Sequence, residues 1–198
     1  GASLDKIKQV VDVRDGEIMF GLNMVVHKGK TIFVGDTSVH EYPTSKQMAE
    51  MAISTARVVR LFGFDPRVAF VSHSTFGQPL TSRTKHIRDA VDILRERKVD
   101  FEFDGDMQPD VALNPEYEEL YPFSKIVGKA NILIMPGQHS AAISYKLMKT
   151  IGDTKVIGPL LIGLGLPIEI APLRSSTSEI LNLASIAAYS ADVIDYKK

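Results

Sequence analysis

Hydrophobic and polar positions alternate along the chain in short blocks, which predict strands and helices in turn. Apolar runs at 21–26 and 31–34 flank the polar turn 27–30 and predict a β-hairpin. The next block begins with capping-box spacing, a hydroxyl at Thr44 and an amide three residues later, and apolar residues then recur at helical spacing. We therefore predict a helix that starts at Thr44 and ends at Gly63, which serves as its C-terminal cap.

The rest of the chain repeats the order of strand and helix. Strands are predicted at 68–72, 100–103 and 131–136, and helices around 87–95, 115–120, 141–151 and 178–190. Apolar segments at 160–162 and 168–170 bracket the glycine-rich Gly163-Leu164-Gly165. Strands separated by helices indicate an α/β fold, with a mostly parallel sheet and helices on both faces.

Composition excludes several classes of function. The 198 residues suit one domain, or one domain and part of another. Lys and Arg number 23 against 24 Asp and Glu, so the basic excess typical of nucleic-acid-binding domains is missing. The absence of cysteine excludes disulfides, thiolate metal sites and a thiol nucleophile. No apolar run approaches the ~20 residues of a membrane span and no signal peptide is visible, so we expect a cytoplasmic protein.

The first residues suggest an artificial start. The chain opens on Gly1-Ala2-Ser3 without methionine, as a sequence does after removal of a tag. We therefore expect the chain to be a piece of a larger protein.

A polar loop follows the strand predicted at 68–72. In open α/β sheets, ligands bind beyond the carboxyl ends of the strands. The loop offers hydroxyls, backbone N–H groups and a glycine, which suit a phosphate or a carbonyl oxygen; the residues are Ser72, Ser74, Thr75 and Gly77. An ordinary helix-capping loop would have the same composition. The residues alone leave both interpretations open.

Two further loops occupy equivalent positions. Clustered acids at 104–110 fit a cation, but the spacing is not that of a calcium hand, and a turn rich in Asp is favoured over a metal site. The segment 136–140 holds His139, a general base in one interpretation and a solvated histidine in the favoured one. The ligand-binding candidates in these loops are Asp104, Gly105, Gln108, Asp110, Pro136 and Gln138. No catalytic residue and no metal ligand is assigned.

Several segments jointly resemble the phosphate acetyltransferase family. They include 128–136 with its continuation Ala142-Ile143-Ser144-Tyr145-Lys146, the acidic segment from Asp104 to Ala112, the loop 72–77, and 158–168. The segments follow the family's order from about Pro43 to Ala188.

The resemblance implies a fold and an activity. Such enzymes have two α/β domains, bind their ligand in the cleft between them and exchange acetyl between coenzyme A and phosphate. Residues 1–170 resemble the second domain, and 171–198 the segment and helix that return to the first. The first domain is absent from the sequence, so the isolated chain is expected to be a poor transferase.

One departure from the family concerns its Ser-Arg pair ahead of the C-terminal helix. Aligned on Ile180-Leu181-Asn182, that pair falls on Pro172-Leu173, which argues against transferase activity. The nearby Arg174, Ser175 and Ser176 remain candidates for holding phosphate through charge-assisted hydrogen bonds. The competing interpretation is a cluster that caps the last helix.

Large NADP-dependent malic enzymes end in a phosphotransacetylase-like domain, and the chain is similar to that domain, especially over 20–26 and 34–37. The resemblance implies a regulatory domain that binds acetyl-CoA and carries no cofactor itself. NADP and Mg or Mn would serve the parent enzyme, which decarboxylates malate oxidatively to pyruvate. Expected partners are the rest of that enzyme and a second copy in a homo-oligomer, with no nucleic acid and no membrane. The alternatives are part of an active phosphate acetyltransferase and a dimerisation module.

Overall fold

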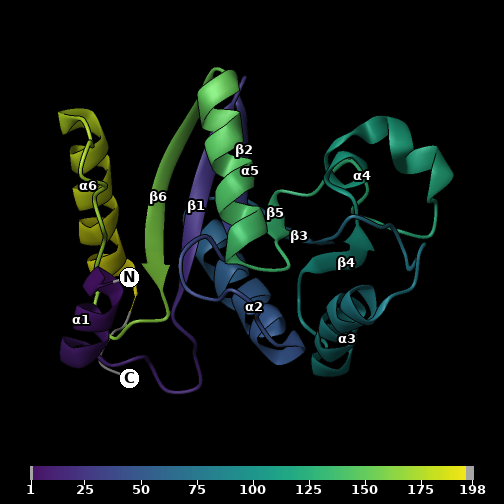
Figure 1. The fold of residues 1–198 in the computed structure, drawn as a ribbon, viewed down its shortest axis with the longest axis horizontal. Coiled ribbons are helices and arrows are strands. Elements are labelled where there is room, and N and C mark those ends of the chain that lie inside the picture. Colours follow the sequence, from purple (N-terminus) through teal and green to yellow (C-terminus); the bar gives the residue numbers. More distant parts are fainter. Residues whose placement is uncertain (1, 195–198) are drawn as a thin grey trace.

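The computed structural model describes residues 2–194 and contains one sheet flanked by helices (Figure 1). The helices are α1 (Ala2–Val10), α2 (Ser45–Leu61), α3 (Ser82–Arg97), α4 (Pro109–Leu113), the 3-10 helix η1 (Pro115–Leu120), α5 (Gln138–Ile151) and α6 (Thr177–Val193). The strands are β1 (Phe20–His27), β2 (Lys30–Gly35), β3 (Arg67–Val71), β4 (Glu102–Met107), β5 (Ile132–Ile134) and β6 (Thr154–Ile162).

The six strands lie in the order β4-β3-β5-β2-β1-β6. Strands β2, β5, β3 and β4 pair in parallel, whereas β1 is antiparallel to both β2 and β6. The sheet is thus mixed but mostly parallel, and the predicted α/β class and hairpin are confirmed.

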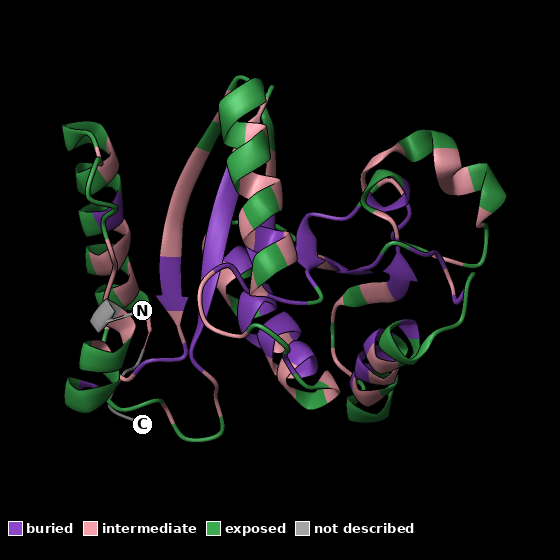
Figure 2. Ribbon diagram, viewed as in Figure 1, coloured by how far each residue is buried: buried purple, intermediate pink, exposed green. Residues whose placement is uncertain are grey.

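Helices cover both faces of the sheet, because the central strands are apolar on both sides. In β3, Val68 and Phe70 pack with α2 and α3, while Ala69 and Val71 pack with α4 and the start of α5. The same alternation continues in β5. Figure 2 shows these strands buried and α6 largely exposed.

Local hydrogen bonds determine where three helices begin. Thr44 and Gln47 form the predicted capping box of α2, which ends at Leu61 just before Gly63. Equivalent reciprocal caps start α3 at Thr81 and α6 at Ser176. Because a capping box satisfies backbone N–H groups that have no partner within the helix, such starts can be read from sequence.

One strand prediction and one helix boundary are wrong in detail, and one strand is longer than its apolar pattern indicates. Strand β4 covers 102–107 rather than 100–103, so Asp104-Gly105-Asp106 lies in a strand and not in a turn. Strand β6 begins at Thr154, although the apolar segment in the sequence covers only 160–162. It is an edge strand, which tolerates Pro159 where its pairing is irregular. Helix α5 begins three residues before Ala141. The short helix α1 was not predicted.

None of the helices within residues 2–194 is long and apolar enough to cross a membrane.

Candidate functional site

The carboxyl ends of β4, β3, β5 and β2 are neighbours, and the loops that follow them form one edge of the sheet. At its centre, Ser74 donates a short hydrogen bond to the carboxylate of Asp106, and both residues are fully buried. The other carboxylate oxygen accepts a hydrogen bond from Gly77 N at 3.0 Å. Ser72 Oγ lies 3.2 Å from Ser74 Oγ and extends this network.

A β-bulge explains why Asp106 faces this loop. Phe70 pairs with Gly105 and Val71 pairs with Met107, so Asp106 is an extra residue in β4 without a partner in β3. Such a residue is turned away from the regular alternation of strand side chains. The bulge therefore directs a carboxylate at the loop after the neighbouring strand.

The loops after β3 and β4 are further joined through Gln108. Its backbone N–H donates to Thr75 Oγ1 at 3.2 Å, and its side-chain amide donates to His73 O at 2.7 Å. Gly77 has φ +78°, and the Arg88 guanidinium occupies the position that a Cβ would take. The predicted loop residues are thus brought together, but their polar groups bond mainly to one another.

Asp36, after β2, organises the adjacent loop. Its Oδ1 accepts hydrogen bonds from Gly21 N (2.9 Å), Ser38 N (2.8 Å) and Val39 N (3.1 Å). Its Oδ2 accepts one from His40 N at 2.7 Å and lies 2.7 Å from His40 Nδ1. The fully buried carboxylate therefore holds the loop against the start of β1.

The loop after β5 packs directly on the Asp36 loop. Gln138 N donates to His40 O at 2.8 Å, and a Cβ on Gly137 would clash with Glu41 O. Gly137 gives α5 no side-chain cap, in contrast to α2, α3 and α6. Pro136 and His139 are exposed, and His139 Nε2 lies 3.9 Å from Glu41 Oε1.

Asp104 and Asp110 point to different surroundings. Asp104 lies 3.6 Å from Arg95 of α3 and accepts a hydrogen bond from Gly105 N at 2.9 Å. Asp110 accepts one from the Tyr117 hydroxyl at 3.3 Å, and its negative charge raises the pKa of Tyr117. Within residues 2–194, no group of three or more His, Asp or Glu side chains is arranged to hold a metal ion.

Arg174, Ser175 and Ser176 lie away from the strand ends. Ser176 caps α6, and Glu179 in the same turn lies 3.1 Å from Lys149 in the last turn of α5. Helix α5 has 14 residues and is roughly 20 Å long, and Gln138 lies at its other end. The segment 174–176 is therefore about a helix length from Gln138. The structure thus separates these three candidates from the other ten.

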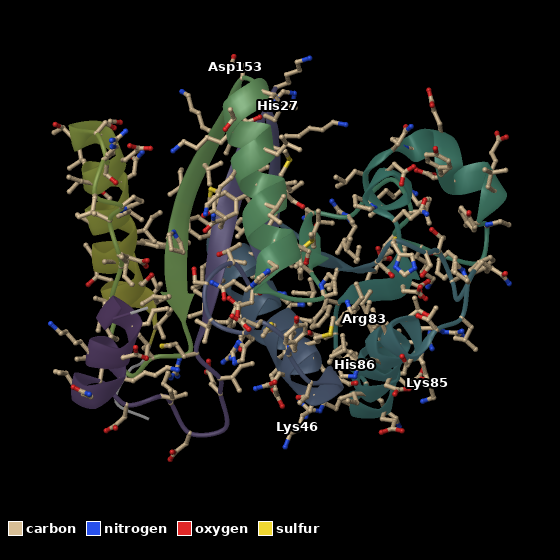
Figure 3. All side chains as sticks on the ribbon, in the orientation of Figure 1. His27, Lys46, Arg83, Lys85, His86 and Asp153 are labelled. Carbon is tan, nitrogen blue, oxygen red and sulfur yellow. The ribbon has the colours of Figure 1, made fainter. Side chains whose placement is uncertain are left out.

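A basic cluster that the sequence analysis does not identify lies at the edge of the sheet where the parallel strands β2, β5, β3 and β4 end, which is the carboxyl edge. Lys46, Arg83, Lys85 and His86 gather where α2 and α3 begin (Figure 3). His86 links the two helix starts, since its Nε2 lies 2.8 Å from Pro43 O and its Nδ1 lies 2.9 Å from Ser45 Oγ. Lys85 pairs with Asp89 at 2.9 Å, whereas Lys46 and Arg83 are exposed.

Sequence reasoning also passed over the two buried carboxylates, Asp36 and Asp106. The residues from Gly35 to Thr37 carried part of the family resemblance, which was the available signal for Asp36. Nothing local marks Asp106 among its acidic neighbours, because the bulge that selects it depends on pairing with β3.

Comparison with known proteins agrees with the fold and the resemblance. The profile of the phosphate acetyl/butaryl transferase family matches residues 2–188. The NADP-dependent malic enzyme of Rhizobium meliloti (strain 1021) is 43% identical over 189 residues, which cover 96% of this chain and 25% of the enzyme. The phosphate acetyltransferase of Bacillus subtilis (strain 168) is 31% identical over 92% of this chain and 57% of its own length.

A solved phosphotransacetylase from Streptococcus pyogenes superposes with a TM-score of 0.90 at 29% identity, covering 96% of this chain and 59% of that one. The chain thus spans about a quarter of its malic enzyme relatives and under two thirds of the transacetylases. Because the family profile matches nearly the whole sequence, this chain belongs to the phosphate acetyl/butaryl transferase family.

Proposed function

We propose that the chain is a regulatory domain of an NADP-dependent malic enzyme and that it binds acetyl-CoA. The observation that carries the proposal is the similarity to a quarter-length segment of such enzymes, at 43% identity in one of them. The parent would decarboxylate malate oxidatively to pyruvate with NADP and Mg or Mn, outside this segment. Pro172-Leu173, in place of the Ser-Arg pair expected from the resemblance, supports sensing over transfer.

The carboxyl edge of the sheet supports an anionic ligand such as coenzyme A. Lys46 and Arg83 extend from the first turns of α2 and α3, and α5 starts nearby without a side-chain cap. Cationic side chains and N–H groups at helix starts both favour phosphate oxygens. The buried Ser72, Ser74 and Asp106 would support this edge, since they already bond to one another.

Isothermal titration of the full-length gene product with acetyl-CoA tests the proposal. We expect saturable binding that weakens roughly tenfold in Lys46→Ala/Arg83→Ala, because two phosphate contacts are removed. Lys155→Ala, on the edge strand β6, is the control and should bind normally. A well-folded sample without binding would contradict the proposal.

A working phosphate acetyltransferase is the second candidate, favoured by the Bacillus subtilis relative. Robust formation of acetyl phosphate by the full-length product would support it over sensing.

A dimerisation role is supported by one surface. Ile143, Leu147 and Ile151 form a stripe along α5 and are 66%, 55% and 78% exposed. They are spaced four residues apart and so share one face of the helix. Sedimentation of the full-length protein and of Leu147→Glu tests the role: the variant should dissociate, and an unchanged oligomer would contradict it.

A further inference from the structure

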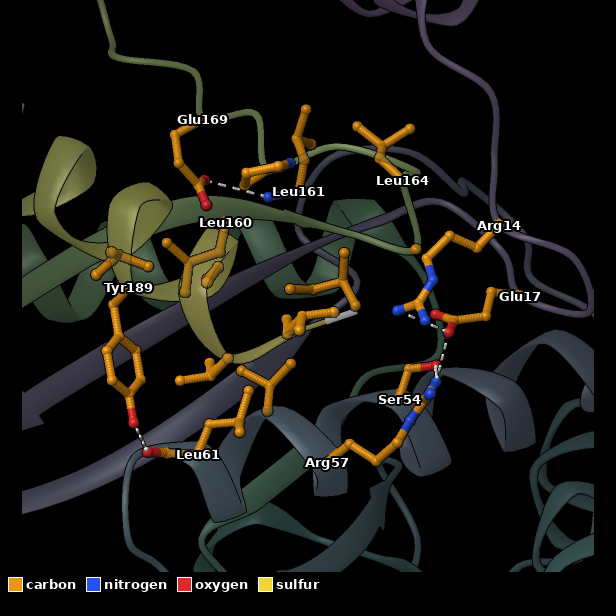
Figure 4. Close-up of a pocket in the computed structure, with 18 of the residues that line it drawn as sticks. Arg14, Glu17, Ser54, Arg57, Leu61, Leu160, Leu161, Leu164, Glu169 and Tyr189 are labelled. Atoms are coloured by element: carbon orange, nitrogen blue, oxygen red, sulfur yellow. Dashed lines mark hydrogen bonds and ion pairs between the residues drawn. The ribbon is translucent and has the colours of Figure 1, made fainter. Parts of the chain in front are cut away.

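A cavity of about 360 Å³ lies between α2, β6 and α6 and shares no lining residue with the strand-end loops described above (Figure 4). Its walls are mainly aliphatic and include Val58, Leu61, Leu160, Ile162 and Ile186. The volume is within the range of small-molecule sites, ~300–1,000 Å³. The cavity therefore offers room and apolar surface for a compact ligand.

Most polar groups around the cavity are already paired. At one end, Arg57 lies 3.0 Å and Arg14 3.5 Å from the carboxylate of Glu17. At the other, the Tyr189 hydroxyl donates to Leu61 O at 3.3 Å and connects α6 to α2. These contacts pair the polar groups at both ends of the cavity within the protein itself.

Glu169 differs from Glu17 in lacking a charged partner among the described residues. It lines the cavity from the segment that follows β6, and its Oε2 accepts one hydrogen bond, from Leu161 N at 3.3 Å. Among residues 2–194 it has no cationic partner within salt-bridge distance, although Arg14, Arg57, Arg60, Glu17 and Tyr189 also line the cavity.

Burial raises the pKa of Glu169 to about 8. At neutral pH the side chain is then a carboxylic acid with an O–H donor instead of an anion. A carboxylic acid can donate its O–H to a neutral hydrogen-bond acceptor such as a carbonyl oxygen.

We propose that this cavity binds a small neutral molecule with an aliphatic body and one carbonyl oxygen, which accepts a hydrogen bond from Glu169. The aliphatic walls would contact the aliphatic body of the ligand, and the Glu169 carboxyl would donate a hydrogen bond to its carbonyl oxygen. Ketones, esters and the acyl ends of thioesters share this chemistry. The site is separate from the proposed coenzyme A site at the carboxyl edge and does not depend on it.

Heptan-2-one is the probe, titrated into the 198-residue protein and followed by the methyl NMR signals of Leu160 and Ile186. We expect saturable shifts at pH 6.5, and binding abolished in Ile186→Trp, which fills the cavity. Leu181→Trp is the matched control, because Leu181 on the same helix is 64% exposed and does not line the cavity. Circular dichroism establishes that each variant is folded.

Variants of Glu169 test the hydrogen bond and remain informative if Ile186→Trp does not fold. Glu169→Gln keeps a donor and should bind as the wild type does, whereas Glu169→Leu should bind roughly tenfold more weakly. Raising the pH to 9 should weaken binding by the wild type and leave Glu169→Gln unchanged. Wild-type affinity in folded Glu169→Leu or Ile186→Trp would overturn the proposal, as would no shift at all.

Competition distinguishes the two sources of the carbonyl. Displacement of heptan-2-one by hexanoyl-CoA, but not by coenzyme A, assigns the cavity to the acyl end of a thioester. Absence of displacement assigns it to a free carbonyl compound. Acetyl-CoA binding that persists in Ile186→Trp shows that the two proposals succeed or fail separately.

Discussion

The hydroxyl of Ser74 donates to the carboxylate of Asp106 across the carboxyl ends of β3 and β4, and neither residue is exposed to solvent. This hydrogen bond joins the loop after β3 to the end of β4, two segments that the sequence analysis treats as separate candidate sites. A buried carboxylate is tolerated only when hydrogen bonds replace its hydration. The pair therefore determines how the strand-end loops are held.

Ser74→Ala should lower the free energy of unfolding by about 1–3 kcal/mol, because it removes a donor from a buried carboxylate. Urea unfolding followed by circular dichroism measures the change. Ser178→Ala, at an exposed position of α6, is the control and should stay within about 0.5 kcal/mol of the wild type. Equal stability of the two variants would mean that the hydrogen bond contributes nothing.

Asp36→Ala should lower the free energy of unfolding by at least about 3 kcal/mol, because several backbone N–H groups would lose their acceptor together. The loop from Asp36 to Pro43 should then exchange its amide hydrogens faster than in the wild type. Hydrogen exchange with mass spectrometry measures this effect. Asp15→Ala, on an exposed turn, is the comparison, and similar exchange in both variants would refute the assigned role.

Glu169 should make stability depend on pH in a defined direction. Burial raises its pKa from 4.5 to about 8, so between these values the folded protein holds a proton that the unfolded chain releases. The stabilising contribution of the protonated Glu169 to folding is complete below pH 4.5 and is lost as the pH rises toward 8. Glu169→Gln should flatten this part of the curve of urea midpoint against pH. An unchanged slope would show that Glu169 ionises normally.

Gly137→Ala should destabilise the protein by about 1–3 kcal/mol, because the new methyl group would clash with Glu41 O. Thermal unfolding measures the loss. The control is Gly165→Ala, where a Cβ would lie 3.3 Å from Asp12 O and needs only a small adjustment. A loss of stability no greater than that of the control would indicate that the backbone at Glu41 moves aside to accommodate the methyl group.

The features that sequence reasoning predicted well are local. The hairpin between 21 and 34 follows from alternation around a turn, and α2 follows from Thr44 and its helical apolar spacing. The same reasoning misplaced β4 because a bulge extends the strand through polar residues. It shortened β6 because an edge strand carries weaker apolar patterning.

The sequence by itself determined the α/β class, most of the helices and three loops rich in polar residues, since caps, turns and periodicity depend on neighbours in the chain. Only the tertiary structure decided which of those residues meet. It joined Ser74 to Asp106 through strand pairing, and it placed Ser176 at the far end of α5 from Gln138. It also placed Glu169 on the wall of a cavity that α2, β6 and α6 line. Contacts between distant segments depend on the register of the sheet and the packing of helices on it, which no local pattern records.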